Sequence, residues 1–215
     1  MTCAMLKIWI SACLGAFLAG SIPFGLLVMR LAGKGDVRAQ GSGNIGATNV
    51  LRAGGKGLGI VTLALDTAKG FLPLYLARQA GLGPEALPAV ALAAVAGHVF
   101  TPWLRFKGGK GVATALGTVL AFHPALVAPA LGVFLAAVLA FRYVSLGSVL
   151  AAATLFLTTL GWAGAWAYPP PPPDLPRWPG PLAWGLLAAL VIYKHRANLD
   201  RLVHGAESPL WGARR

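Results

Sequence analysis

The feature that most constrains this chain is a series of long apolar runs that contain almost no charge. Of its 215 residues, 57% are hydrophobic and only 11% are charged. A soluble domain carries roughly 25% charged residues, because its surface must be hydrated. Lipid must therefore solvate most of this surface, and the sequence predicts an all-α integral membrane protein. The length suits a single polytopic domain over residues 1–215.

The apolar runs predict about seven transmembrane helices. A bilayer core needs about 20 mostly apolar residues per helix. Fewer suffice when a helix is short or broken, and five runs are clear candidates: residues 4–27, 58–77, 86–104, 148–168 and 181–193. A sixth, residues 112–141, is too long for one upright span, and His123-Pro124 near its middle favours a turn between two short helices. The first run resembles a signal peptide, but more runs follow, so we interpret it as a retained helix.

Basic residues set the predicted orientation. Eighteen Lys and Arg against six Asp and Glu give a net charge of +12, but the cations lie between the apolar runs rather than along one of them. The positive-inside rule explains them better than a nucleic-acid partner, and we expect none. All clusters share one side only if two crossings separate each from the next. This predicts the N-terminus outside and the C-terminus in the cytoplasm, with the proline-rich residues 169–173 on the outer side.

The first polar loop reads GSGNIGATN over residues 41–49 and is followed by Arg52. Its G-x-G-x-x-G pattern, with Asp66 twenty residues after the last glycine, matches a dinucleotide fingerprint. That fingerprint requires a βαβ unit, whereas this loop follows one membrane helix and Asp66 lies inside the next. The residues instead favour an anion nest of backbone N–H groups, the Ser42 hydroxyl and the Arg52 fork. A flexible polar loop is the alternative.

The second polar loop reads FKGGKGVAT over residues 106–114. It places glycine N–H groups, a helix N-terminus and Lys110 together, an arrangement that binds anions. A positive-inside anchor would explain Lys107 and Lys110, but not three glycines. The nearby His98 is expected to be packed or hydrogen-bonded rather than catalytic.

The third polar segment reads YKHRANLDR over residues 193–201. His195 and Asn198 are three residues apart, so on a helix they would share a face and could contact an oxyanion or a phosphate. A solvated helix end is the alternative. Within the membrane, Asp66 and Lys69 are expected to form a structural ion pair. The absence of a carboxylate cluster predicts no metal and no cofactor.

Together these motifs make residues 20–207 resemble the bacterial acyl-phosphate:glycerol-3-phosphate acyltransferases (PlsY-type). The proline-rich residues 169–179 are the main departure from that pattern. The resemblance implies a seven-helix protein of the bacterial cytoplasmic (inner) membrane, with its active site on the cytoplasmic face. It further implies transfer of a fatty acyl group from acyl phosphate to the sn-1 hydroxyl of glycerol 3-phosphate, giving lysophosphatidic acid and phosphate. This would be the first step of phospholipid biosynthesis, supplied by a soluble acyl-phosphate-producing enzyme.

The resemblance also assigns roles to individual residues. The catalytic group is Ser42, Arg52, Lys110, His195 and Asn198. The substrate-binding group is Gly43, Asn44, Thr48, Asn49, Gly108, Gly109, Gly111 and Ser145. Glu207 is expected to hold the C-terminal segment.

The implied transfer is direct and metal-free, without an acyl-enzyme, and the proton acceptor is either a substrate phosphate oxygen or His195. A small transporter of phosphate-bearing anions is the rival function. A transporter should place polar groups at the membrane midplane, whereas only Asp66 and Lys69 lie deep.

Overall fold

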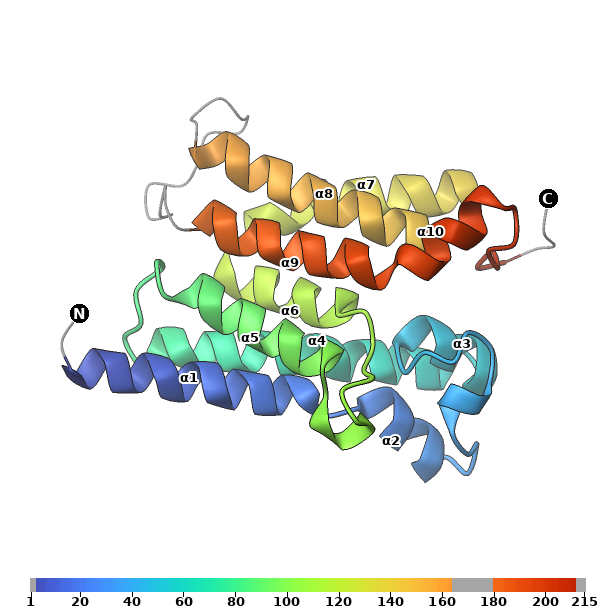
Figure 1. Ribbon diagram of the computed structural model, residues 1–215, viewed down its shortest axis with the longest axis horizontal. Coiled ribbons are helices and arrows are strands. Elements are labelled where there is room, and N and C mark those ends of the chain that lie inside the picture. The colour runs from blue at the N-terminus through green and yellow to red at the C-terminus, as the bar shows by residue number, and fades with distance from the viewer. Residues whose placement is uncertain (1–2, 164–179, 212–215) are drawn as a thin grey trace. The chain divides into compact units, whose positions relative to one another are not determined.

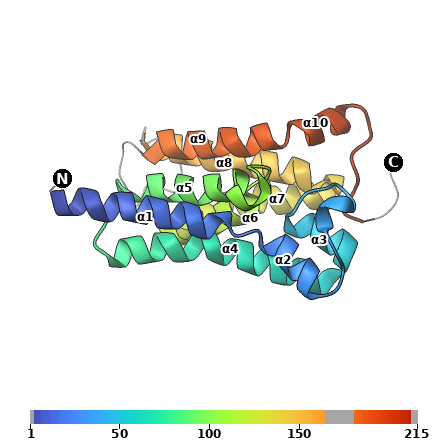
Figure 2. The ribbon, with the colours of Figure 1, turned by 60° about the horizontal axis from the view of Figure 1, so that its bottom comes forward.

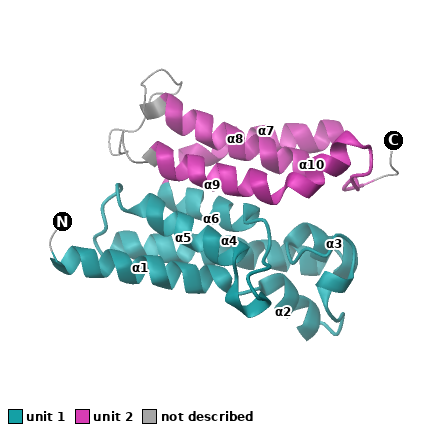
Figure 3. Ribbon diagram, viewed as in Figure 1, with its two compact units in different colours: residues 1–122 teal, residues 123–215 magenta. Residues whose placement is uncertain are grey.

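The computed structural model describes residues 3–163 and 180–211, and every regular element in that part of the chain is a helix. The predicted all-α membrane architecture is thus confirmed. Two compact units, Met1–Phe122 and His123–Arg215, divide the chain (Figure 3). The proline-rich residues 169–179 lie outside the described residues.

Five helical stretches are long and apolar enough to cross a membrane: Cys3–Leu31, Lys56–Gln79, Leu87–Leu104, Pro124–Phe141 and Val144–Gly161. Two shorter apolar helices, Val112–Phe122 and Pro181–Lys194, accompany them. The predicted interruption at His123-Pro124 is confirmed, because α6 (Val112–Phe122) ends there and α7 (Val127–Phe141) follows a short 3-10 turn.

Unit 1 is a bundle of α1 (Cys3–Ser21), α4 (Lys56–Gln79), α5 (Leu87–Val99) and α6. Helix α1 packs along α5, and α4 packs along α6 (Figures 1 and 2). Glycines allow these contacts: a methyl group at Gly97 would overlap the Phe17 carbonyl, and one at Gly20 would overlap the Ala94 carbonyl. Gly70 and Gly117 meet carbonyls of the facing helix in the same way. Small residues at such crossings let helix backbones approach closely inside a membrane.

We therefore expect Gly97→Ala to destabilise unit 1 by about 1–3 kcal/mol, because overpacking forces two helix backbones apart. Thermal unfolding in detergent should show a lowered Tm. Gly15→Ala is the matched control, since its added methyl group meets no atom of the described chain within 4 Å. Equal melting of the two variants would show that the α1–α5 contact is adaptable.

The predicted continuous span over residues 4–27 is wrong, because α1 ends at Ser21 and Pro23 separates it from α2. At this interruption begins a cap of short elements at one end of unit 1. It comprises α2 (Phe24–Leu31), the 3-10 turn η1 (Val37–Ala39) and α3 (Ala47–Gly54). The cap has its own hydrophobic cluster: Leu26, Met29, Val37, Ile45, Val50 and Leu104. Burial of this cluster gives the polar loop before α3 a firm base.

Unit 2 consists of α7, α8 (Val144–Ala163), α9 (Gly180–Lys194) and the short α10 (Arg196–Val203). Helix α8 packs against both α7 and α9. Beyond α10 the chain returns to the turn between α7 and α8, where the Leu210 N–H donates to the Arg142 carbonyl at 2.7 Å. The chain is interrupted after α9 at His195, which is the N-cap of α10, and Asn198 follows in the first turn of that helix, where its N–H donates to the His195 carbonyl at 2.8 Å.

Candidate active site

The first polar loop is organised by Asn49 of α3, which is only 2% exposed. Its Oδ1 accepts the Ser42 N–H at 2.9 Å. Its Nδ2 donates to the carbonyls of Val37, Gln40 and Asn44 at 3.1, 3.0 and 2.8 Å. The Asn49 amide is thus occupied within the loop, and these contacts position the loop itself rather than a ligand.

Part of the backbone of this loop is committed to hydrogen bonds within the loop. The Ser42 N–H is taken by Asn49, the Gly43 N–H donates to Gln40, and the Gly46 N–H donates to the Asn44 side chain. Three amides expected to face an anion are therefore committed to the loop. The Ser42 side chain itself is exposed.

The second polar loop follows α5 through the 3-10 turn η2 (Pro102–Leu104). Arg105 and Phe106 both have left-handed backbones, with φ of 51° and 61°, a conformation uncommon outside glycine. The Phe106 N–H donates to the Thr101 carbonyl at 2.9 Å, which holds this conformation. Gly111, with φ of 83°, completes the loop before α6 begins.

Two glycines of the second loop pack against the end of α5. The Gly108 and Gly109 N–H groups donate to the Val99 and His98 carbonyls, both at 3.1 Å. A methyl group at Gly109 would overlap the His98 ring. Packing against the end of α5 thus requires these glycines, and their N–H groups are bonded to that helix end. Lys110 of the same loop is half-buried.

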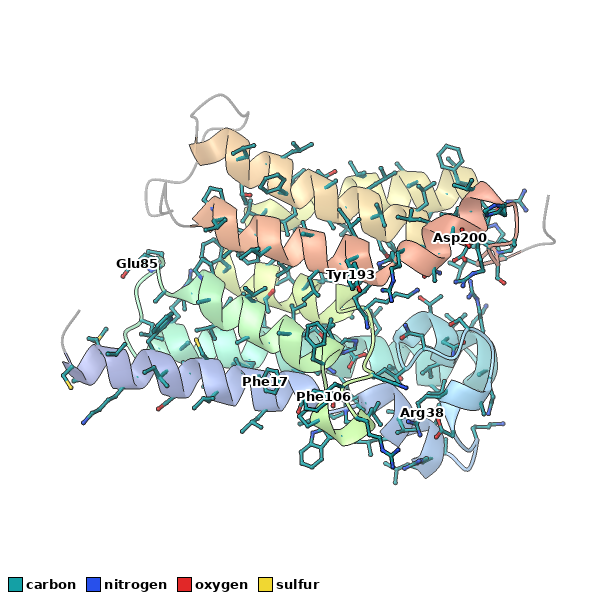
Figure 4. The ribbon with its side chains drawn as sticks, in the orientation of Figure 1. Phe17, Arg38, Glu85, Phe106, Tyr193 and Asp200 are labelled. Carbon is teal, nitrogen blue, oxygen red and sulfur yellow. The ribbon has the colours of Figure 1, made fainter. Side chains whose placement is uncertain are left out.

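Both loops lie at one end of unit 1. Leu104, just before the second loop, packs in the same hydrophobic cluster as Ile45 of the first loop. This shared packing connects the two loops. In Figure 4, Arg38 and Phe106 lie toward the cap end, whereas Glu85 lies at the opposite end. Unit 1 therefore gathers Ser42, Arg52 and Lys110 on the same end of its helices.

The polar group of unit 2 is built around the carboxylate of Glu207, which is 5% exposed. Its Oε1 accepts hydrogen bonds from Ser145 Oγ at 2.8 Å and from Asn198 Nδ2 at 2.6 Å. Its Oε2 accepts one from Arg201 Nε at 2.8 Å. Burial alone would raise the pKa of Glu207, but the hydrogen bonds from Asn198, Ser145 and Arg201 outweigh it and hold that pKa below its usual value.

These bonds fix what the neighbours of Glu207 can offer a ligand. The single hydroxyl proton of Ser145 is directed at the carboxylate, so Ser145 can offer a substrate only its lone pairs. The carboxylate is acceptor-only, so the Asn198 amide must turn its nitrogen toward Glu207 and its oxygen away. One N–H of the Asn198 amide is thereby committed to Glu207.

His195 is held by its backbone neighbour Val191. Nδ1 lies 2.8 Å from the Val191 carbonyl oxygen, which can only accept. Nδ1 therefore carries a hydrogen, and Nε2 is the nitrogen that gains or loses a proton. His195 is 2% exposed, so its ring orientation is fixed by packing as well.

The charges inside unit 1 are paired as expected. Lys69 Nζ lies 2.8 Å from Asp66 Oδ1 in α4, and both side chains are buried. Among residues 3–163 and 180–211, no three His, Cys, Asp or Glu side chains are grouped as metal ligands.

Comparison with known proteins identifies the family. The family model for glycerol-3-phosphate acyltransferase matches residues 10–205 of this sequence. The chain belongs to this family. It is therefore a membrane acyltransferase, as the motifs predicted, and the transporter alternative is set aside.

Relatives and solved structures match over nearly the full length. A glycerol-3-phosphate acyltransferase of Trichlorobacter lovleyi is 48% identical over 200 residues, covering 93% of this chain and 95% of its own. That of Geobacter sulfurreducens is 46% identical, covering 90% and 93%. The glycerol 3-phosphate form of PlsY (YgiH), an integral membrane glycerol 3-phosphate acyltransferase, is 38% identical with a TM-score of 0.82 and covers 97% and 96%. Its lysophosphatidic acid form is 37% identical with a TM-score of 0.80, covering 94% of each chain.

Proposed function

We propose that this protein moves a fatty acyl group from acyl phosphate to the sn-1 hydroxyl of glycerol 3-phosphate. The products are lysophosphatidic acid and phosphate, and the reaction is the first step of phospholipid biosynthesis. One observation carries the proposal: the chain matches, over nearly its whole length, solved structures of an acyltransferase in glycerol 3-phosphate and lysophosphatidic acid forms. The acyl phosphate donor comes from the resemblance of the three polar motifs.

The cations of unit 1 serve the phosphate groups in this proposal. Arg52 offers a fork that matches phosphate oxygens, Lys110 adds a point charge, and the Ser42 hydroxyl adds a donor. Gly43, Asn44, Thr48 and Gly111 line the same loops as binding residues. His195 and Asn198, which belong to unit 2, complete the catalytic group that the resemblance implies.

The transfer is direct and metal-free. The sn-1 oxygen attacks the acyl carbon, the bond from that carbon to the phosphate oxygen breaks, and the hydroxyl proton passes to a phosphate oxygen of the substrate. Acyl phosphate is already activated, so alignment contributes most, at about 7–11 kcal/mol of the barrier. Each fixed donor at the developing oxyanion adds about 2.7–4 kcal/mol.

In this proposal the chain crosses the membrane seven times. The two shorter apolar helices, α6 and α9, cross together with the five longer stretches. The N-terminus is then outside, and the C-terminus and the catalytic loops face the cytoplasm at the bacterial inner membrane. A soluble enzyme that produces acyl phosphate supplies the donor.

The deciding assay uses purified protein in detergent with palmitoyl phosphate. Phosphate should be released only when glycerol 3-phosphate is added, in equal amount to the lysophosphatidic acid formed. Release without glycerol 3-phosphate would indicate a hydrolase, and no release would overturn the proposed reaction. An acyl group trapped on Ser42 or Ser145 would rule out direct transfer.

Replacing His195 separates the two proton acceptors. If a substrate phosphate takes the proton, His195→Gln lowers kcat by less than about 100-fold and keeps the pH–rate profile, since only a hydrogen bond is lost. General-base catalysis contributes up to about 10⁴-fold. A loss above a thousandfold together with a vanished pH limb would therefore make Nε2 the base. His204→Gln is the control, because His204 is exposed at the end of α10.

A further inference from the structure

The first membrane stretch is broken between α1 and α2, at Ser21, Ile22 and Pro23. The break leaves backbone carbonyls without their usual partners in the helix. Two side chains from other elements bind them. Thr101 Oγ1 donates to the Ser21 carbonyl at 2.6 Å, and Lys69 Nζ donates to the Ile22 carbonyl at 2.7 Å. The break is therefore a built feature, held from two sides.

Lys69 is fixed in that position by the charge beside it. Its ammonium forms the ion pair with Asp66 at 2.8 Å and lies 5.7 Å from the centre of the Phe24 ring. Lys69 is 5% and Asp66 2% exposed. A buried pair of this kind contributes little net stability, because desolvation offsets the attraction. Its geometric effect is specific: it sets where α2 begins.

The same group of residues reaches the second polar loop. The Nδ1 of buried His98 lies 3.9 Å from Asp66 Oδ1, and the other side of the imidazole packs on Gly109. The His98 carbonyl accepts the Gly109 N–H, and the Thr101 carbonyl accepts the Phe106 N–H. Thr101 and His98 thus connect the helix break to the loop that carries Lys110.

The first polar loop is connected through α2. A methyl group at Gly25 would overlap the Ile45 carbonyl, so α2 packs directly on the backbone of that loop. Moving the start of α2 would move Ile45 and, with it, the segment that carries Ser42. The break, the ion pair and both loops form one continuous set of contacts within unit 1.

We propose that Asp66, Lys69, His98 and Thr101 form a positioning network that fixes the two polar loops relative to each other for binding glycerol 3-phosphate. None of these four residues contacts a reacting atom of the substrates in this proposal. The network acts through the α1–α2 break, and the inference rests on the proposed function. Loss of the network should therefore raise KM for glycerol 3-phosphate while Tm changes little.

Two buried threonines make a matched test. Thr101 and Thr62 are both 0% exposed, but only Thr101 donates to the broken helix. Within the described chain, the Thr62 hydroxyl has no hydrogen-bond partner. Thr101→Val should raise KM for glycerol 3-phosphate at least about tenfold, with kcat within about threefold and Tm within about 3 °C of the parent. Thr62→Val should leave all three unchanged, and Thr101→Ser should restore KM.

The double variant Asp66→Leu/Lys69→Met removes both charges together and leaves no buried charge unpaired. It should also raise KM while it remains monodisperse in detergent. Equal KM values for Thr101→Val, Thr62→Val and the parent would overturn the network, as would losses of activity that only follow losses of Tm. An inactive parent would instead overturn the proposed function, so the two failures are distinguishable.

Discussion

Arg52→Ala is expected to lower kcat/KM for glycerol 3-phosphate by about 10²- to 10⁴-fold. A guanidinium that forks onto a phosphate makes two charge-assisted hydrogen bonds, each contributing about 1.5–3 kcal/mol. Arg52→Lys retains the charge but not the fork, so its activity should fall between those of the parent and the alanine variant. Steady-state kinetics on detergent-purified protein, with Tm measured in parallel, would measure the loss.

Arg38→Lys is the matched control, because Arg38 lies on the same cap. Its guanidinium already forks onto Asp36, with Nε to Oδ1 at 3.0 Å and Nη2 to Oδ2 at 2.6 Å. Exposed pairs of this kind contribute little to stability, so this variant should behave like the parent. If Arg38→Lys lowered kcat/KM as much as Arg52→Lys does, the basic residues at this end of unit 1 would act on the substrate collectively. Arg52 would then have no individual role.

The sequence predicts the membrane helices well because length and apolarity alone decide them. The interruption between α6 and α7 follows from Pro124, whose ring cannot continue the preceding helix. Short elements are harder to predict. Helix α3 has only eight residues, too few for composition to indicate a helix, and α2 begins inside the apolar run of residues 4–27, whose composition does not show the break after Ser21. Their stability comes from the shared cluster around Met29 and Val50, which joins residues distant in the sequence.

The sequence places Ser42 and Lys110 in the polar loops and Arg52 just after the first of them, where the structure has it in the last turn of α3. It does not indicate how the loop backbones are used. Glycine-rich motifs suggest N–H groups that face an anion, whereas Gly108 bonds to Val99 on the preceding helix. Such pairing depends on which remote segments meet, and local composition does not encode it. Thr101 was missed for the same reason, since its partner Ser21 lies 80 residues away.

Glu207→Gln is expected to destabilise the protein by about 1–3 kcal/mol, the cost of leaving a buried hydrogen-bonding group without its partner. The amide would turn an N–H toward Arg201 or toward Ser145 and Asn198, so at least one buried donor loses its acceptor. A lowered Tm at pH 7 would measure this. Asp200→Asn is the control, because the Asp200 side chain is 72% exposed.

The pH dependence of stability supplies a second and independent signature of the same carboxylate. Its pKa is held below the usual value in the folded protein, so Glu207 stabilises the fold above its ordinary pKa of about 4.5, and this contribution is lost as pH falls through the lowered value. The parent should therefore melt at progressively lower temperature below about pH 4.5. In Glu207→Gln this acid-dependent part should be missing, whereas Asp200→Asn should retain it. A Glu207→Gln variant that keeps the acid limb would place its origin in another carboxylate, and the C-terminal segment would then be held by the Leu210–Arg142 backbone bond rather than by charge.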